Sequence, residues 1–165
     1  MRRTLQVLNE FERAGVLCRY AIGGAMGATF YVEPLLTFDL DVFVVLPKAA
    51  GELLSLGPLY DALRARGYQE DGECVAIEGV PVQFLPVYNA LIEEAVSEAQ
   101  DVMYDDTSTR VVRAEHLVAI SVQAGRDKDR ERVRLLREQA TLDMQYLKDI
   151  LARHNMERQW TQWTT

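Results

Sequence analysis

Two aspartates separated by a single residue are the side chains of this chain best suited to chemistry. Asp39 and Asp41 open the run DLDVFVVL, whose apolar residues predict a β-strand. In a strand, residues two apart share a face, so both carboxylates point the same way, with backbones about 7 Å apart at roughly 3.3 Å rise per residue. Neighbouring carboxylates repel each other unless water, a proton or a cation relieves them. Their oxygens suit Mg²⁺ or Mn²⁺, so we predict that Asp39 and Asp41 bind one of these ions.

A pair of glycines precedes these aspartates. Gly23 and Gly24 end the apolar run YAI and open residues 25–32, which we expect to be a short helix. A glycine lets a ligand approach the backbone closely, and the first amides of a helix face an anion. The pair is therefore predicted to bind phosphate. Taken singly, either motif is also consistent with a structural role, as a glycine turn or as aspartates at the solvated end of a strand.

Together, the apolar strand, the glycine pair, the spacer and the Asp-Leu-Asp strand resemble the signature of the DNA polymerase β-like nucleotidyltransferase superfamily. Within it, the sequence is most similar to small bacterial nucleotidyltransferases related to abortive-infection toxins of toxin-antitoxin systems. Two later stretches add to the resemblance. VPVQFLP at 80–86 resembles the third-carboxylate strand of that group, and EHLVAI at 115–120 with AGRDKDR at 124–130 resembles its C-terminal helical segment.

The resemblance implies a fold, a reaction and partners. The fold is an α/β (α+β) one, a nucleotidyltransferase-like mixed β-sheet flanked by helices with a C-terminal helical segment. The reaction is the metal-dependent transfer of a nucleoside monophosphate from an NTP to an acceptor hydroxyl. Asp39 and Asp41 hold the metal and act in catalysis with the residue at position 83. The implied acceptor is a tRNA end, a protein side chain or a small molecule, and the toxin group favours the first two. A cognate antitoxin is an implied partner.

Gln83 stands where relatives usually carry the third carboxylate. An amide cannot act as a general base at neutral pH, so two interpretations stay open. Asp106 or Glu78 replaces the missing carboxylate if the fold brings either beside Asp41. Otherwise the protein is a degenerate member, weakly active or inactive, that binds a nucleotide or a protein partner without transfer.

Ser121 stands where relatives often carry a phosphate-binding lysine. Arg126 and Lys128, with Arg130, are predicted to replace that contact, because guanidinium and ammonium groups bind phosphate well. The alternative is that this run is the solvated start of a helix, in which the two intervening aspartates neutralise their basic neighbours.

Apolar patterning and turn residues predict the elements that position these groups. Helices are expected at 4–13, 52–66 and 89–99 and repeatedly from 114 onward, and strands at 17–22, 39–46, 74–77, 80–87, 102–104 and 110–112. A polar loop is expected at 105–109, and Gly57 with Pro58 is expected to break or kink the second helix.

Composition is typical of one globular domain. The chain has 165 residues, of which 48% are hydrophobic and 26% charged. We expect a single nucleotidyltransferase-like domain over 1–165, with a core at about 15–113, C-terminal helices at about 114–155 and a tail at 156–165. A net charge of −7 disfavours broad capture of DNA or RNA. No apolar run approaches the ~20 residues of a membrane helix.

Cysteine, histidine and tryptophan complete the set of informative residues. Cys18 and Cys74 form no metal motif and are expected to be buried free thiols, which fits a reducing cytoplasm. His116 is expected to be a cap or a surface contact. Trp160 and Trp163 lie in a polar tail that is either frayed or docked through its rings.

Overall fold

The computed structural model of the chain describes residues 1–33, 36–48 and 55–164. Its strands form a seven-stranded sheet in the order β3-β4-β5-β2-β1-β7-β6. The strands are β1 (Arg19–Ile22), β2 (Leu40–Val45), β3 (Glu70–Asp71), β4 (Cys74–Ile77), β5 (Val80–Pro86), β6 (Gln100–Tyr104) and β7 (Thr107–Val111). The helices are α1 (Arg2–Arg13), α2 (Gly24–Ala28), α3 (Gly57–Ala65), α4 (Ala90–Ser97), α5 (Ala114–Ala124), α6 (Asp127–Gln139), α7 (Met144–Arg153) and α8 (Glu157–Thr164).

The sheet is mixed, and its central strand is β2. This strand runs antiparallel to β1, with Ile22 opposite Val42, and parallel to β5, with Asp41 beside Gln83. A parallel pair needs a crossover connection, which here contains α3 and the β3-β4 hairpin. The predicted mixed sheet flanked by helices is confirmed.

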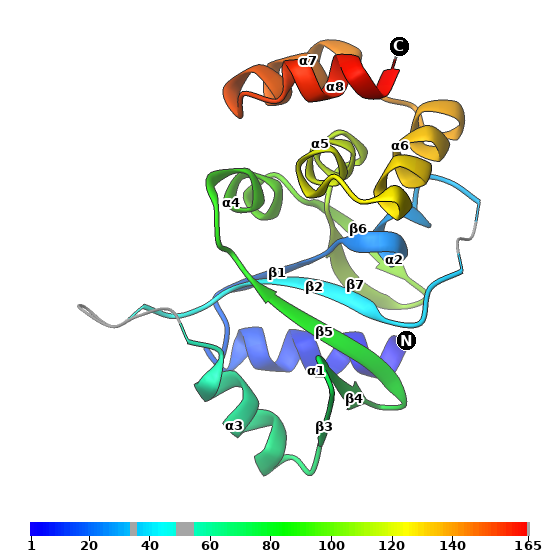
Figure 1. Cartoon of the computed structure of the whole chain (residues 1–165). Helices are drawn as coiled ribbons and strands as arrows, with labels where there is room; N and C mark the ends of the chain where they lie inside the picture. The colour runs from blue at the N-terminus through cyan, green and yellow to red at the C-terminus, as the bar shows by residue number, and fades with distance from the viewer. Residues whose placement is uncertain (34–35, 49–54, 165) are drawn as a thin grey trace.

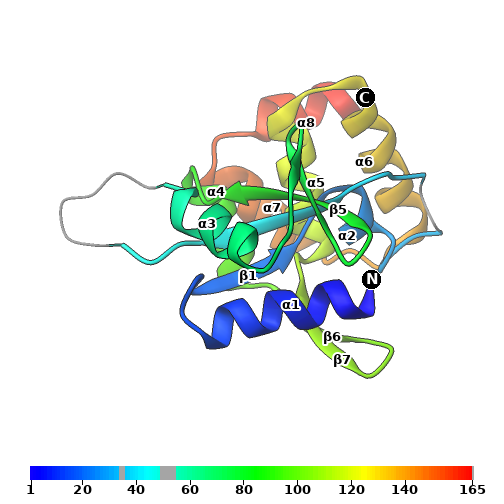
Figure 2. The same ribbon diagram turned by 90° about the horizontal axis from the view of Figure 1, so that it is seen from below.

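Helices cover both faces of the sheet (Figure 1). The alternation along β2 buries Leu40, Val42 and Val44 against α1 and α3, which lie on the same face (Figure 2). Phe43 points to the opposite face and joins the core formed with α4 and α5. On that side, α7 and α8 lie outside α5 (Figure 1). The core therefore has one layer on each side of the sheet, and the C-terminal helices extend one of them.

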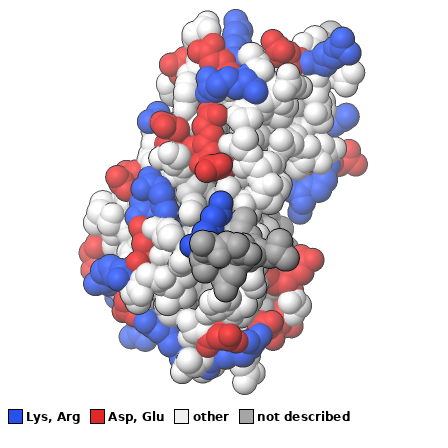
Figure 3. Space-filling view, turned by 90° about the vertical axis from the view of Figure 1, so that its left-hand side faces the viewer, with Lys and Arg blue, Asp and Glu red and all other residues white. Residues whose placement is uncertain are grey.

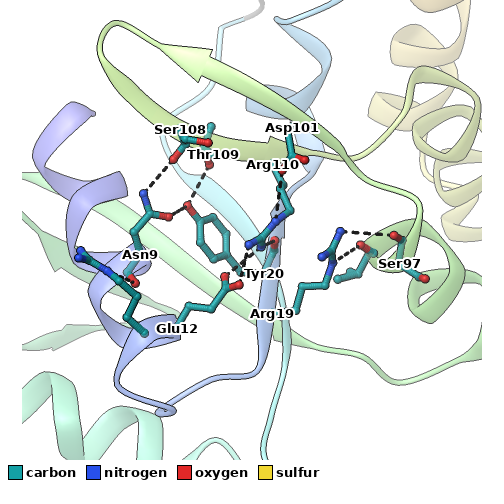
Figure 4. A network of polar contacts seen from close by, with 11 residues as sticks. Asn9, Glu12, Arg19, Tyr20, Ser97, Asp101, Ser108, Thr109 and Arg110 are labelled. Carbon is teal, nitrogen blue, oxygen red and sulfur yellow. Dashed lines mark hydrogen bonds and ion pairs between the residues drawn. The ribbon is translucent and has the colours of Figure 1, made fainter.

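A network of polar side chains joins helix α1 to strands β1 and β7 (Figure 4). The Tyr20 hydroxyl donates to Asn9 Oδ1 at 2.7 Å and lies 3.0 Å from Thr109 Oγ1. Arg110 Nη1 donates to Glu12 Oε2 and to the Tyr20 carbonyl, both at 2.9 Å. These groups satisfy one another, so the network is an anchor for α1.

Two predicted boundaries are wrong, and a third lies outside the described residues. Helix α3 begins at Gly57, and Pro58 lies in its first turn, where a missing N–H is tolerated; the expected start at 52 lies outside the described residues. Strand β1 begins at Arg19, later than expected. The loop expected at 105–109 is shorter: it is a turn of two residues, Asp105 and Asp106, and Asp105 has φ of 53°. Strand β7 already begins at Thr107, which pairs with Tyr104.

The C-terminal tryptophans are docked in a helix. Both lie in α8, and the Arg137 guanidinium carbon is 5.5 Å from the ring centroid of Trp160. Trp163 is covered in the same way by Arg130, at 5.2 Å. The docked alternative for this tail is therefore the right one.

His116 was expected to be a cap or a surface contact, but its side chain is fully buried. Its Nε2 lies 3.1 Å from Glu94 Oε1. Glu94 also accepts hydrogen bonds from Arg153 Nη2 at 2.6 Å and is 2.8 Å from His154 Nε2. One carboxylate of α4 thereby connects α5 to α7 and the residue that follows it.

Glu94→Gln is expected to destabilise the fold by about 1–3 kcal/mol at pH 7, because charge-assisted hydrogen bonds are lost. Burial alone would raise the pKa of Glu94, but hydrogen bonds from Arg153, His154 and His116 lower it to about 2. A lowered folded-state pKa adds stability above the unfolded value of 4.5, and this is lost as pH falls toward 2. Urea unfolding at several pH values should show the wild-type advantage shrinking below pH 4.5. The exposed neighbour Glu93 provides the control Glu93→Gln. Equal stability of the two variants at pH 7 would contradict the prediction.

Candidate functional site

The two aspartates and the residue at position 83 lie together where β2 begins. Asp39 directly precedes β2, and Asp41 is its second residue. Gln83 of β5 is the Cα partner of Asp41 in the parallel register, so both side chains stand on the same face of the sheet. The strand that resembles the third-carboxylate strand therefore lies directly beside the Asp-Leu-Asp strand.

These residues line a cavity of about 620 Å³ between the sheet and the helices α5 and α6. This volume lies within the usual range for small-molecule sites. Its polar lining comes from Gly24, Thr37, Asp39, Asp41, Gln83, Tyr88, Ser121, Arg126, Lys128, Asp129, Glu131 and Arg132. Carboxylates of β2 and cations of α6 therefore share one cavity.

The glycine pair lets α2 pack directly on β2. Gly24 has φ of +58°, and a Cβ atom there would overlap the Asp41 carboxylate. A Cβ atom at Gly23 would overlap the Phe43 ring, and the Gly23 N–H donates to the Asp41 carbonyl at 2.9 Å. Gly24 lines the cavity. Gly23 instead has a packing role, and phosphate binding by the pair stays a prediction.

Asp41 is a half-buried carboxylate with little compensation. Within residues 1–33, 36–48 and 55–164, its side chain has no hydrogen bond or ion pair. Burial, and secondly the charge of Asp39, raise the pKa of Asp41. Arg132, Lys128 and Arg126 of the α6 region act in the opposite direction. Asp41 therefore lies in a site that favours an added positive charge.

The carboxylate pair fits a hard divalent cation. Asp39 is held by Thr37, whose hydroxyl donates to the Asp39 carbonyl at 3.1 Å and lies 3.4 Å from its Oδ1. In the described part of the chain, no three His, Cys, Asp or Glu residues converge on one point. Mg²⁺ characteristically binds one or two carboxylates and keeps water and phosphate oxygens as its other ligands. The two oxygen donors match that preference.

A buried aspartate organises the cations. Asp129 is fully buried, and its Oδ2 accepts from Arg126 Nε at 2.6 Å. Its Oδ1 accepts from Arg132 Nη1 at 3.0 Å. Arg126 is thus neutralised by Asp129, as we expected if this run were the solvated start of a helix. Arg126 nevertheless lines the cavity, together with Lys128 and Arg132. Arg130 does not, because it covers Trp163.

Two buried polar atoms beside the cavity lack a hydrogen-bond partner in the described part of the chain. They are Ser121 Oγ and Arg132 Nε, and both residues line the cavity. Unsatisfied buried donors are rare in native proteins, and a bound anion would satisfy them. Arg132 was missed from the sequence, although the spacing of Arg126, Asp129 and Arg132 by three residues is the signal that could have found it.

The cavity mouth carries exposed apolar side chains. Leu36 is 87% exposed, Phe38 81% and Tyr88 64%, and all three line the cavity. Exposed aromatic faces beside a polar cavity are suited to stacking on a planar ring. No motif in the sequence predicted this rim.

The predicted substitutes for the third carboxylate lie elsewhere. Glu78 accepts from the Tyr68 hydroxyl at 2.8 Å, and Asp106 lies 3.6 Å from Arg2 Nη1. Neither stands beside Asp41, so both suggestions are wrong. The carboxylate that Gln83 contacts is Glu73, whose Oε2 accepts from Gln83 Nε2 at 3.0 Å.

Both cysteines are free thiols, as expected, but neither is fully buried. Cys18 is exposed because β1 begins after it, and Cys74 is half-buried in β4.

No described helix is long and apolar enough to cross a membrane. Basic and acidic side chains are interspersed over the face seen in Figure 3.

Comparison with known proteins identifies the fold. No protein-family model matches the sequence, and no curated protein matches it. An antigenic nucleotidyltransferase-like protein from Paracoccidioides brasiliensis matches in structure with a TM-score of 0.58 at 12% identity, over 94% of this chain and 86% of that one. ANT(2'')-Ia in complex with adenylyl-2''-tobramycin matches with a TM-score of 0.53 at 15% identity, over 90% of this chain and 95% of that one.

A solution structure of the antibiotic-resistance factor ANT(2'')-Ia matches with a TM-score of 0.51 at 17% identity, over 94% of this chain and 93% of that one. At such identities the similarity shows the fold alone. The chain therefore has the nucleotidyltransferase fold that the sequence predicted. The link to toxin-antitoxin proteins stays a prediction.

Proposed function

We propose that the protein is a metal-dependent nucleotidyltransferase that moves a nucleoside monophosphate from an NTP to an acceptor hydroxyl. One observation carries the proposal. The carboxylates of Asp39 and Asp41 and the cations of the α6 region line the same cavity, and two buried polar atoms beside it have no partner in the described part of the chain. A metal-bound triphosphate carries the charges and oxygen atoms that this arrangement lacks.

Asp39 and Asp41 would hold Mg²⁺ or Mn²⁺. When bound, such an ion neutralises charge on the phosphates and supports an in-line displacement. Arg126, Lys128 and Arg132 bind the triphosphate oxygens by charge-assisted hydrogen bonds. The Ser121 hydroxyl, which has no partner among the described residues, donates one more.

The remaining residues orient the nucleotide. The Gly24 backbone borders the carboxylates without a side chain between them. Phe38 and Tyr88 bind the flat face of the base at the cavity mouth. The acceptor oxygen attacks the α-phosphorus, and pyrophosphate leaves with its charge stabilised by the cations of α6.

The acceptor and the biological setting are drawn from the sequence resemblance. It favours a tRNA end or a protein side chain, in a toxin-antitoxin or phage-defence role with a cognate antitoxin as partner. ANT(2'')-Ia is described with an adenylylated antibiotic, so a small-molecule hydroxyl is a third acceptor class. We place the reaction in the cytoplasm, because two free thiols fit a reducing compartment.

Gln83 favours a second candidate function. An amide stands beside Asp41 where the superfamily strand usually bears a carboxylate, and it cannot accept the acceptor proton. A degenerate module that binds a nucleotide or a protein partner without transfer would have this site. The two functions share nucleotide binding and differ in turnover.

Transfer itself separates them. Purified protein is incubated with each of the four NTPs labelled at the α-phosphate, Mg²⁺ or Mn²⁺, and either total tRNA or a cell extract. We expect metal-dependent labelling of one acceptor class, absent when EDTA removes the metal. Metal-dependent nucleotide binding without any labelling or pyrophosphate release would favour the degenerate module.

Lys128→Met is expected to weaken metal-NTP binding by about 10–100-fold, because a charge-assisted contact of roughly 1.5–3 kcal/mol is lost. The exposed Lys148 of α7 provides the matched control Lys148→Met. Calorimetry at two salt concentrations should show a reduced salt dependence for the first variant alone. Equal affinities for the two variants would remove Lys128 from the phosphate site.

A further inference from the structure

We propose that Glu73 is the general base of this site and takes the role of the carboxylate that Gln83 replaces. The inference rests on the proposed function and adds a catalytic residue to it. Glu73 lies on the turn between β3 and β4, outside the sequence motifs, and it contacts the cavity through Gln83.

The strand register brings this turn to the site. Asp41 is beside Gln83, and on the other side of β5 Val82 is opposite Val75 of β4. One step further along this antiparallel pair, Cys74 stands beside Gln83 and on the same face. Glu73 directly precedes Cys74, so the turn lies at the end of a row that starts at Asp41.

Gln83 holds the carboxylate of Glu73 in place. Its Nε2 donates to Glu73 Oε2 at 3.0 Å, and Gln83 itself lines the cavity. In the described part of the chain, Glu73 Oε1 has no partner, and the residue is exposed. One oxygen is thus positioned, and the other is free to accept a proton.

The surrounding charges agree with this placement. Burial, and then the charges of Asp39, Asp41, Glu73 and Asp71, raise the pKa of the Cys74 thiol. The charges of the metal-binding pair and of the turn therefore both act on the Cys74 side chain. Ser121 Oγ and Arg132 Nε, which have no partner within the described residues, independently indicate a ligand in the same cavity.

The transfer step requires only the NTP, the acceptor and Glu73. The acceptor oxygen forms a bond to the α-phosphorus while the bond from that phosphorus to the pyrophosphate oxygen breaks. The acceptor proton passes to Glu73, and pyrophosphate leaves with the bonding electron pair. An exposed carboxyl group then returns the proton to solvent, so the base is regenerated for each turnover.

The test uses water as the acceptor, so that no natural acceptor is needed. Pyrophosphate release is measured with Mn²⁺ and whichever of ATP, CTP, GTP or UTP binds most tightly, and the nucleotide Kd is measured by calorimetry. Glu73→Gln is expected to lower kcat by about 10²–10⁴-fold with a nearly unchanged Kd. Asp71→Asn, an exposed carboxylate in β3 of the same hairpin, is the matched control and should keep the wild-type rate.

The reciprocal exchange distinguishes a base from a structural contact. Glu73→Gln combined with Gln83→Glu keeps an amide-carboxylate pair and moves the carboxylate to β5. We expect this double variant to regain at least about tenfold in kcat over Glu73→Gln alone. No gain from the exchange would overturn the proposal, as would a wild-type rate in Glu73→Gln. Failure of the proposed function is distinct, since the wild type itself would then bind no metal-nucleotide, or bind it without releasing pyrophosphate.

Discussion

Replacing Asp41 by asparagine is expected to lower nucleotidyl transfer by about 10³-fold or more, because a metal ligand contributes several kcal/mol to charge stabilisation. The side chain keeps its size and its place in β2, so the fold should persist. The exposed Asp106 provides the control Asp106→Asn. Transfer rates with Mg²⁺ and with Mn²⁺ measure the effect. A variant with more than a tenth of the wild-type rate would exclude Asp41 as an essential ligand.

The same substitution should stabilise the metal-free protein. Burial and the neighbouring Asp39 raise the folded-state pKa of Asp41 above its ordinary 3.8. A raised pKa contributes stability only below the unfolded value, and this is lost as pH rises through the folded value. At pH 7 the charged group is therefore a net cost, and Asp41→Asn should gain about 1 kcal/mol, as many substitutions at strained functional sites do. Urea unfolding in EDTA would contradict this if the variant were less stable than the wild type.

Gly24→Ala is expected to reduce metal-NTP binding by at least about 100-fold, since small displacements at a site have effects of that size. The new Cβ would overlap the Asp41 carboxylate, so the carboxylate or α2 must move. The φ of +58° adds roughly 1–2 kcal/mol of backbone strain to the loss of stability.

Gly67→Ala separates the two effects of this substitution. Gly67 has φ of +86°, but no atom of the described residues lies within 4 Å of its added Cβ, so the variant has the backbone strain alone. We expect both alanine variants to lose stability and only Gly24→Ala to lose nucleotide affinity, in paired thermal unfolding and calorimetric measurements. A matching loss of affinity in Gly67→Ala would show that strain, and not displacement of Asp41, explains the result.

The site residues on β2 and β5 could be predicted because the pattern of neighbouring residues in the sequence determines where they lie. The two-residue period of a strand places Asp39 and Asp41 on one face, and an apolar run predicts the strand that carries Gln83. A turn next to the site is harder to predict. Glu73 reaches Gln83 only because β4 pairs with β5 in one particular register, and sequence spacing does not specify that register.

The half of the site on the C-terminal helices depends on how those helices pack. Arg126, Arg130 and Arg132 are alike in sequence, yet packing directs Arg130 to Trp163 and the other two to Asp129. His116 has the same explanation. Its burial follows from α4 and α7 closing over α5, and a lone histidine in an apolar helix does not specify these neighbours. Long-range packing therefore accounts for most of the predictions that failed.

Calorimetric titration of ATP, CTP, GTP and UTP with Mg²⁺ or Mn²⁺ tests most directly whether this cavity is a metal-nucleotide site. The titration is made on the wild type and on Asp39→Asn/Asp41→Asn, and thermal unfolding shows that both are folded. We predict metal-dependent binding of at least one nucleotide by the wild type and its loss in the double variant. A folded wild type that binds none of the four with either metal, or a double variant that binds as tightly as the wild type, would contradict the account.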